Sequence, residues 1–502
     1  MALYALQHIN LNDKRKEILN KVISGDRVKL SFSFPQKSYM LFLNGMIANL
    51  LGHTDLIFLH ESFFTILRES LLNAVKANAK RLYFEKHNAD IHNSADYDRI
   101  MKKFRNEVIG DMAVVEETLN RSRLYVNFIV ELTKTHILLR IENNSKILPA
   151  EEERVQKRIT QAWSFKDFSE AYDTMYDETE GAGLGIILTV MLLKNIGVTP
   201  DDYRIFAEKD MTIVSLRIPL LIKKQETITA VKEKILREIN LLPTFPQNIM
   251  DLQQLCDNPD SSINLIADKI QTDPSLTADI LKLANSAGFL TVRKIENVSE
   301  ALMRIGLTNL KYILIAASSR KIMDKRYKQF SKIWAHCLDV AAYGRFIVNK
   351  LSMRRLHDKV FIASLLHDLG KIVLLSVDLD LTNWIADFVQ QRGIRSTTIL
   401  EEVSIGISHS TIGKLIAKKW NFADFMEEAI AFHHAPLQAS EENRTVIYIT
   451  YLANIFVGIS TKKYTLDHID PGVLAHLSIK SIKDCEDLYN YCTISLKESR
   501  DL

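Results

Sequence analysis

An adjacent histidine and aspartate, His367-Asp368, are the residues of this 502-residue chain whose types and spacing most clearly suggest chemistry. They end an apolar stretch and are followed by Lys371, so neighbouring positions offer an imidazole, a carboxylate and a cation. An imidazole with a carboxylate suits Zn, Mn, Fe or Ni better than Ca or Mg. A metal held by such ligands polarises a phosphoryl oxygen and makes bound water nucleophilic near neutral pH. The pair therefore predicts a divalent metal site with hydrolytic potential.

Further candidate ligands are spread along the chain on both sides of this pair. They are four histidines and one amide, at His336, His409, His433, His434 and Asn454. These residues form one site only if the fold brings them to a single point. Without a metal, the His-Asp pair would instead be a hydrogen-bonded core element in which the carboxylate orients a ring. The residues alone leave both interpretations open.

The region that must position these ligands is almost wholly helical. From Lys223 onward, apolar residues recur at spacings of three and four, the pattern of amphipathic helices. Pro243, Pro246 and Asp273-Pro274 mark helix boundaries within it. Residues 223–240 predict a connecting helix, whose apolar face is either a dimer contact or a face packed on its own domain.

The helical half resembles HDOD domains over about residues 235–460. The matching segments occur in the order of that family, at residues 241–246, 270–277, 283–287, 301–306 and 409–420. HDOD domains are helical relatives of the HD phosphohydrolases; most are regarded as signalling modules, and many have lost catalytic residues. The resemblance therefore implies an all-α regulatory domain of the HD superfamily.

The related HD-GYP phosphodiesterases use a series of His, His-Asp, His, His-His and Asp to hold their metals. By carry-over, that series implies metal ligands at His336, His367, Asp368, His409, His433, His434 and Asn454. Lys371 matches the lysine that follows the pair, which implies a catalytic residue that neutralises phosphate charge. The chain departs from the family at Asn454, where an aspartate is expected. It also lacks a Gly-Tyr-Pro segment after His434, so the element that recognises cyclic di-GMP is absent.

The first half mixes strand and helix patterns, which predicts an α/β domain up to about Leu221. Residues 124–141 and 212–218 predict strands, and residues 62–81 predict the clearest helix. The charged segment 87–120 predicts a helical insertion that faces solvent.

Two features of this half could bind a nucleotide. Glu69 and Asn73 lie four residues apart on the predicted helix and so share one face. The segment from Gly181 through Gly185 is a glycine-rich turn into a helix that continues to Asn195. Glycines let the backbone approach phosphates closely, and a helix N-terminus favours an anion.

Together these features resemble the N box and second glycine box of GHKL ATPases, over about residues 30–220. The resemblance implies that Asn73 holds Mg²⁺ for ATP and that Glu69 is a catalytic residue assisting proton transfer. It also implies contacts to the nucleotide from Lys76, Asn143, Gly181, Gly183 and Gly185. The first glycine box departs from the pattern of that family, because Asn143 replaces the adenine-binding aspartate and Ser145 replaces a glycine. The alternative is a fold relic in which Asn73 only hydrogen-bonds locally.

Bulk composition is that of a globular protein, with 47% hydrophobic and 25% charged residues. The net charge of +3 is small and the basic residues are dispersed, so direct nucleic-acid binding is not expected. The four cysteines lack metal-knuckle spacing and are expected to be reduced thiols. We expect neither a signal peptide nor a membrane-spanning stretch, and hence a cytoplasmic protein.

We therefore expect a multidomain bacterial protein with a GHKL-like α/β domain, an α+β sandwich, at residues 1–222. A connecting helix at 223–240 would lead to an all-α HDOD domain with C-terminal helices at 241–502. The expected function is regulatory signal transduction, with a signalling protein or a nucleotide second messenger as partner and a homodimer left open. The alternatives are a metal-dependent phosphohydrolase acting on a nucleotide or cyclic dinucleotide and, less favoured, a protein kinase of the anti-sigma type.

Overall fold

The computed structural model of the protein places most of the chain. It describes residues 2–6, 11–104, 112–165, 170, 184–221, 230–258, 260–285, 295–328, 330–392 and 396–501. The chain divides into two compact units, Met1–Thr227 and Ile228–Leu502. The first combines a sheet with helices, and the described residues of the second form helices and turns only. An α/β region followed by an all-helical region is therefore confirmed.

The first unit is built on a six-stranded sheet with the order β1-β2-β3-β4-β6-β5. Its strands are β1 (Ala2–Ala5), β2 (Val28–Phe32), β3 (Val126–Leu132), β4 (His136–Asn143), β5 (Tyr203–Glu208) and β6 (Met211–Pro219). β1 and β2 are parallel, and all other neighbours are antiparallel. The stretch 124–141, expected to form strand, is the hairpin of β3 and β4, and β6 contains the strand expected at 212–218.

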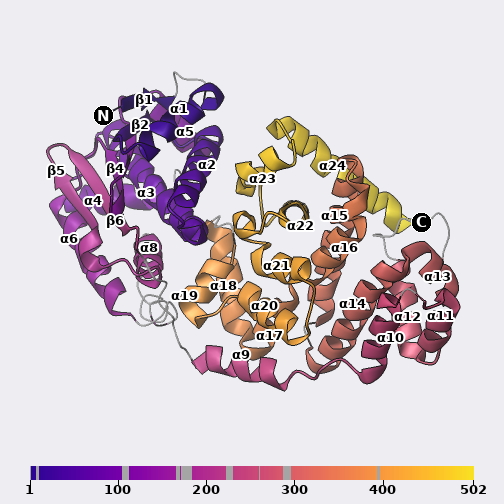
Figure 1. Ribbon diagram of the computed structural model, residues 1–502. Helices are drawn as coiled ribbons and strands as arrows, with labels where there is room; N and C mark the ends of the chain where they lie inside the picture. The colour runs from indigo at the N-terminus through magenta and orange to yellow at the C-terminus, as the bar shows by residue number, and fades with distance from the viewer. Residues whose placement is uncertain are drawn as a thin grey trace. The chain divides into compact units, whose positions relative to one another are not determined.

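Side chains alternate between the two faces of a strand, and from His136 to Ile141 of β4 every second side chain is buried. These buried residues are Ile137, Leu139 and Ile141. Helices pack against the sheet as Figure 1 shows: α1 (Leu11–Ile23) on β2 and β3, α3 (His60–Lys86) on β3 and β4, and α6 (Pro149–Ser164) on β5. The unit therefore combines a sheet with a packed layer of helices.

The remaining helices of this unit are α2 (Lys37–His53), α4 (Ser94–Phe104), α5 (Met112–Asn120) and α8 (Leu184–Asn195). α3 contains the helix expected at 62–81, and α8 ends at Asn195 as the sequence predicts. Within the segment 87–120, residues 87–93 form turns, whereas α4 and α5 are helical and do not simply face solvent. Ile100 and Phe104 of α4 are buried, as is Leu119 of α5, because these short helices are amphipathic and pack one face inward.

The second unit is a bundle of helices. They are α9 (Ala230–Leu241), α10 (Gln247–Asp257), α11 (Ile263–Gln271), α12 (Pro274–Ala284), α13 (Val298–Ile305), α14 (Leu307–Arg326), α15 (Phe330–Lys350), α16 (His357–Leu366), α17 (Leu369–Val377), α18 (Leu379–Arg392), α19 (Thr398–Ile405), α20 (His409–Lys419), α21 (Asp424–Phe432), α22 (Arg444–Ser460), α23 (Pro471–His476) and α24 (Ile482–Asp501). α16 packs against α15, α21 and α22 near the middle of this unit (Figure 1).

Helix α9 falls in the segment for which the sequence left two interpretations open. Its apolar residues Ile235 and Ile239 are buried, and the helix packs on α17 and α20. Lys419 of α20 donates hydrogen bonds to the carbonyls of Ile239 and Asn240. The described part of this segment is thus packed on its own unit, while Ile228 lies outside the described residues.

One helical run, Arg354–Val377, is long and apolar enough to cross a membrane by length and composition alone. In the structure 78% of its most apolar window is buried. The run is also interrupted between α16 and α17 by the His367-Asp368 pair. Core packing within the bundle therefore accounts for its apolar character.

Candidate metal centre

The His367-Asp368 pair occupies the junction between α16 and α17. The backbone leaves the helical path at Asp368, with φ −99° and ψ 17°, and α17 restarts at Leu369. Both side chains point into the bundle, because His367 is 0% and Asp368 2% exposed. The apolar sequence on either side buries this junction. A polar pair is thereby held in the core, where its partners have to come from other helices.

Four histidines, the adjacent His367 and three from other helices or helix ends, surround the Asp368 carboxylate. Oδ1 lies 3.3 Å from Nε2 of His409 and 3.4 Å from Nε2 of His433. Oδ2 lies 3.8 Å from Nε2 of both His336 and His367. The ligand atoms form two groups that share the aspartate, one of Asp368, His409, His433 and His434, the other of His336, His367 and Asp368. The structure thus brings all five predicted histidines to one point.

Hydrogen bonds at Nδ1 set the orientation of three of these rings. Nδ1 of His367 donates to the carbonyl of Ser364 at 2.6 Å, and Nδ1 of His433 donates to the carbonyl of Ile430 at 2.9 Å. Nδ1 of His409 donates to the Glu401 carboxylate at 2.7 Å. A neutral imidazole has one N–H, so in each ring Nε2 is left with a lone pair facing the centre. This is the tautomer that a metal ligand requires.

Among the described residues, no hydrogen-bond donor reaches these lone pairs. Nε2 of His409 and Nε2 of His433 face each other at 3.2 Å although neither neutral ring has a proton to share there. Nε2 of His367 and Oδ1 of Asp368 are buried without a hydrogen-bond partner among the described residues. Buried acceptors that face one another cost free energy unless a cation lies between them. The donor set therefore fits a divalent metal.

Glu401 of α19 is a part of the centre that sequence reasoning missed. It is 0% exposed and accepts hydrogen bonds from the ring and the backbone N–H of His409. The available signal was a pair of glutamates, Glu401-Glu402, within an apolar helix. That signal cannot show which carboxylate turns inward, because the choice depends on the rotation of α19 about its axis.

The ionisation states of the centre suit a cation. Burial by itself would raise the pKa of Asp368, but the positive charge of Lys371 outweighs it and holds that pKa well below its usual value. Burial lowers the pKa of His336 to about 4 and also lowers the pKa values of His367 and His433. The carboxylate is therefore charged and these imidazoles are neutral at pH 7, the forms that bind metals.

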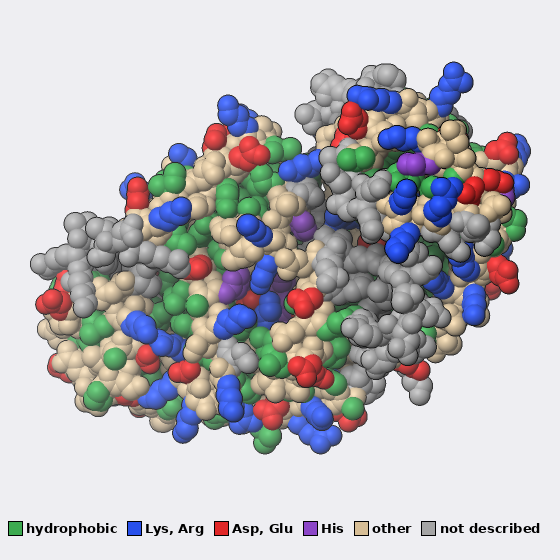
Figure 2. Space-filling model, turned by 180° about the vertical axis from the view of Figure 1, so that it is seen from behind, with side chains coloured by type: hydrophobic (Ala, Val, Ile, Leu, Met, Phe, Trp, Pro, Cys, Tyr) green, Lys and Arg blue, Asp and Glu red, His purple; other side chains and the backbone are tan. Residues whose placement is uncertain are grey.

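The centre reaches the surface on the side of His336 and Lys371. Their side chains keep 29% and 26% of their area exposed, whereas His409 and His433 are fully buried. Nζ of Lys371 lies 3.5 Å from Oδ2 of Asp368. Figure 2 shows histidine side chains in a hollow beside Lys or Arg side chains on the face drawn. The centre is therefore exposed to solvent on this side.

Asn454 of α22 lies beside His336. Its Oδ1 is 3.2 Å from Nε2 of His336, so the amide oxygen accepts a hydrogen bond from the ring. Asn454 is 5% exposed. The structure thus places the residue at the centre, where it contributes a neutral oxygen.

Two glycines allow the helices that carry the ligands to approach. A Cβ atom on Gly370 of α17 would overlap the carbonyl oxygen of His409 and the backbone of Gly413 in α20. Gly413 in turn has no room for a Cβ beside Ile430 of α21. This backbone contact sets the distance between Asp368 and His409, because each lies within a few residues of one glycine.

Residues 242–436 match the HDOD domain family. The helical unit therefore contains an HDOD domain. All five clustered histidines lie within the matched residues, whereas Asn454 lies beyond them. The prediction of an HDOD domain in the helical half is thus confirmed over these residues.

Other proteins resemble the chain over longer or shorter parts. An uncharacterized protein of Treponema pallidum (strain Nichols) is 28% identical over 415 residues, which cover 83% of this chain and 81% of the relative. An HDOD domain protein of Geobacter sulfurreducens matches 54% of this chain and 95% of its own at 21% identity and TM-score 0.43. A candidate metal-dependent phosphohydrolase of Shewanella amazonensis SB2B matches 54% of this chain and 99% of its own at 20% identity and TM-score 0.39.

Outside the HDOD domain, the predicted nucleotide residues have varied surroundings. On α3, Glu69 is 5% exposed, Lys76 is partly exposed and Asn73 is exposed. Gly185 is buried in the first turn of α8, and Gly181 and Gly183 lie outside the described residues. The structure thus shows one buried and one exposed residue on the predicted helix face.

Asn143 is engaged within the protein at the end of β4. It is 3% exposed, and its Nδ2 donates to Oδ1 of Asn78 at 3.1 Å and to the carbonyl of Ser145 at 3.2 Å. Asn78 is a residue of α3 that the sequence did not single out. The helix α3 and strand β4 are therefore joined by a buried amide pair at this point.

Proposed function

We propose that this protein is a regulatory signalling protein whose HDOD domain holds a divalent metal at Asp368. The supporting observation is the 3.2 Å approach of Nε2 of His409 to Nε2 of His433, with both Nδ1 atoms already donating elsewhere. A cation between these acceptors removes their repulsion and satisfies Asp368 at the same time. The group around this position has three histidines and a carboxylate, which favours Zn, Mn, Fe or Ni over Ca or Mg.

A metal-dependent phosphohydrolase is the second candidate, favoured by the position of Lys371. Its Nζ contacts Asp368, and its partly exposed side chain lies on the side of the centre that is exposed to solvent. Burial opposes the charge, but Asp368 outweighs it and raises the pKa of Lys371, so the ammonium is retained. A divalent metal at the centre would supply Lewis acidity and an activated water. Lys371 would bind and orient a phosphoryl oxygen and neutralise its charge.

One residue, Asn454, separates these candidates. Asn454 provides a neutral oxygen where a carboxylate would bind a metal more tightly, which favours binding over turnover. Glu401 and the carbonyls of Ser364 and Ile430 orient the rings for either role. Asn454 therefore favours the regulatory role, and hydrolysis is the alternative.

We also propose that the first unit is a GHKL-like nucleotide-binding module. Its support is the packing of α3 on β3, β4 and α8, with Glu69 buried on that helix. A bound nucleotide would stabilise the native unit. ATP with Mg²⁺ should raise its melting temperature, and Asn73→Ala should remove the effect. No shift with saturating ATP would reject the module.

Elemental analysis tests the metal proposal. Full-length protein purified without chelators should contain Zn, Mn, Fe or Ni, and the double change His409→Ala and His433→Ala should remove it. Metal-free wild-type protein that also fails to bind these ions would overturn the proposal, and a proton shared by the two rings would then explain their approach. Metal-dependent hydrolysis of nucleotides or cyclic dinucleotides that is lost in Lys371→Met would favour the enzyme.

A further inference from the structure

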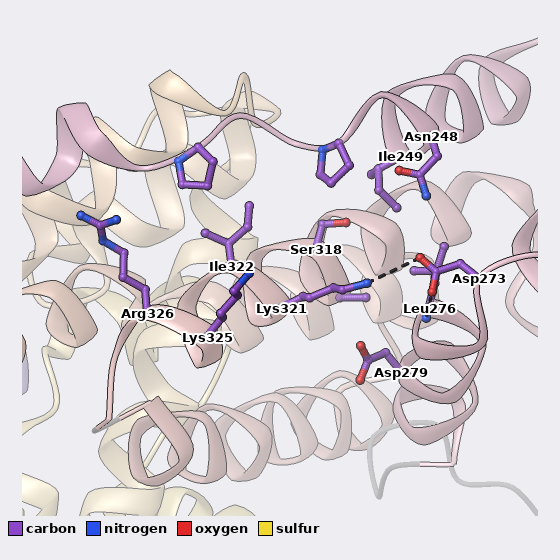
Figure 3. Close-up of a pocket in the computed structure, with 13 residues that line it drawn as sticks. Asn248, Ile249, Asp273, Leu276, Asp279, Ser318, Lys321, Ile322, Lys325 and Arg326 are labelled. Atoms are coloured by element: carbon purple, nitrogen blue, oxygen red, sulfur yellow. Dashed lines mark hydrogen bonds and ion pairs between the residues drawn. The ribbon is translucent and has the colours of Figure 1, made fainter.

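A pocket distinct from the metal centre opens in the helical unit between residues 243–246 and the helices α10, α12 and α14 (Figure 3). Its volume is about 450 Å³. Sites for small molecules typically measure about 300–1,000 Å³. The pocket shares no lining residue with the metal cluster. It is therefore a separate candidate site of the size of a mononucleotide.

The apolar part of the lining is rigid. Proline rings and aliphatic side chains supply it, namely Pro243, Pro246, Ile249, Leu276, Ala317 and Ile322. Ile249 and Leu276 are also part of the core, with 4% of their area exposed. Fixed apolar surfaces of this kind suit a flat ring, which fills a slot at little cost in conformational entropy.

A buried hydroxyl lacks a partner at this pocket. Ser318 of α14 lines it and is 4% exposed. Its Oγ has no hydrogen-bond partner among the described residues. A buried polar group without a partner destabilises the fold, and a ligand with a polar ring atom would satisfy it. Ser318 therefore points to an occupant that can form hydrogen bonds.

Charged groups divide the lining into two ends. In Figure 3, Lys325 and Arg326 lie at one end, and Asn248, Asp273 and Asp279 lie at the other. Arg320 contacts Oδ1 of Asp279 at 3.3 Å, and no described residue forms an ion pair with its Oδ2, so this second oxygen can accept a hydrogen bond. One end can thus bind an anion and the other can accept hydrogen bonds from amino groups.

Lys325 is the cation best placed for an anionic ligand group. Lys321 is paired with Asp273 at 3.5 Å, and Arg326 is paired with Glu238 at 2.8 Å. Within the described part of the chain, no carboxylate pairs with Lys325, which is exposed at the mouth. A phosphate group would therefore meet an ammonium that the protein itself does not neutralise.

We propose that this pocket binds a nucleoside monophosphate. The base would lie between the apolar walls, with Ser318 and Asp279 at its polar edge and the phosphate at Lys325. The site lies outside the metal centre and adds a ligand to the function proposed above. α14, which carries Ser318 and Lys325, packs on α16, the helix that leads into His367. An occupant of the pocket would thus contact a helix adjacent to the metal centre.

Calorimetric titration of the full-length protein with AMP, GMP, CMP and UMP tests the proposal. At least one should bind, and its nucleoside should bind at least about tenfold more weakly because a charged hydrogen bond is lost. Lys325→Glu should weaken the binding of the monophosphate by about tenfold or more. The matched charge reversal Lys269→Glu, at an exposed lysine of α11 outside the pocket, should leave the affinity for the monophosphate unchanged.

Two further variants distinguish a ligand contact at Ser318 from a structural role, and this pocket from a nucleotide site in the first unit. Ser318→Ala should weaken binding by about threefold to tenfold, yet leave the melting temperature of the free protein equal or higher. A purely structural serine would change stability without changing affinity. Binding that is lost in Asn73→Ala but retained in Lys325→Glu would assign the nucleotide to the first unit. That result would overturn the proposal. Equal affinity for nucleosides and monophosphates, or no binding of any monophosphate, would also overturn it.

Discussion

Glu401 accepts hydrogen bonds from both the backbone N–H and the ring Nδ1–H of His409, each at 2.7 Å. Burial alone would raise the pKa of this carboxyl, but His409 and Thr397 outweigh it and lower that pKa. A charged Glu401 fixes the tautomer of His409 and makes its Nε2 a stronger metal ligand. The carboxylate therefore acts on the centre through the ring.

Glu401→Gln should weaken metal binding by about 10- to 100-fold, the usual effect of losing a carboxylate behind a histidine ligand. The amide keeps the size of the side chain but removes its charge. Competition with a metal-chelating dye measures the affinity. Glu402→Gln at the neighbouring position is the matched control and should bind metal as the wild type does. Equal affinity in the Glu401→Gln protein would contradict a positioning role.

Asn454→Asp should tighten metal binding, because a carboxylate replaces the amide oxygen that lies 3.2 Å from Nε2 of His336. An added anionic ligand raises the affinity of such a site by roughly tenfold or more. Asn454→Ser, which stays neutral, serves as the comparison. The same dye competition reports both. If the aspartate variant binds no more tightly than the serine variant, Asn454 does not face the metal.

The sequence predicted the ligands better than the geometry that orients them. His367-Asp368 and the histidines around it were recognisable because their types are rare in apolar helices and their order matched a family. Glu401 was not recognised, because its role depends on which side of α19 faces the bundle. The carbonyls of Ser364 and Ile430 carry no sequence signal at all, since every residue has one.

In the first unit, the sequence predicted the strands and the helix but not the polar contact that joins them. The hairpin of β3 and β4 and the helix α3 followed from periodicity, which reports burial directly. The buried pair of Asn143 and Asn78 did not, because it joins a strand end to a helix 65 residues away in the chain. Long-range polar pairs depend on packing, which periodicity does not describe.

Removal of the metal should destabilise the helical unit. Chelation leaves the facing acceptors of His409 and His433 unsatisfied, and it also removes the binding free energy that supports the native state. At a free metal concentration of 100 times Kd, that contribution is about 2.7 kcal/mol. Calorimetry with and without chelator should show a lower Tm for this unit, restored by adding metal back. In the His409→Ala and His433→Ala double variant, chelator should have no effect.

Gly370→Ala should disrupt both stability and the metal centre. The new Cβ would overlap the carbonyl oxygen of His409 and the backbone of Gly413, so α17 and α20 must move apart. Overpacking of this kind costs about 1–3 kcal/mol, and a backbone clash lies at the upper end. Because Asp368 and His409 separate with the helices, metal affinity should fall as well.

Gly52→Ala in α2 is the matched control, because a Cβ there would meet no atom within 4 Å. Within a helix, alanine is favoured over glycine by about 0.5–1 kcal/mol, so this change should stabilise its own unit slightly. Urea denaturation resolved for each unit measures both effects. A Gly370→Ala protein as stable as the wild type and with unchanged metal affinity would mean that the approach of α17 and α20 does not set the distance between Asp368 and His409.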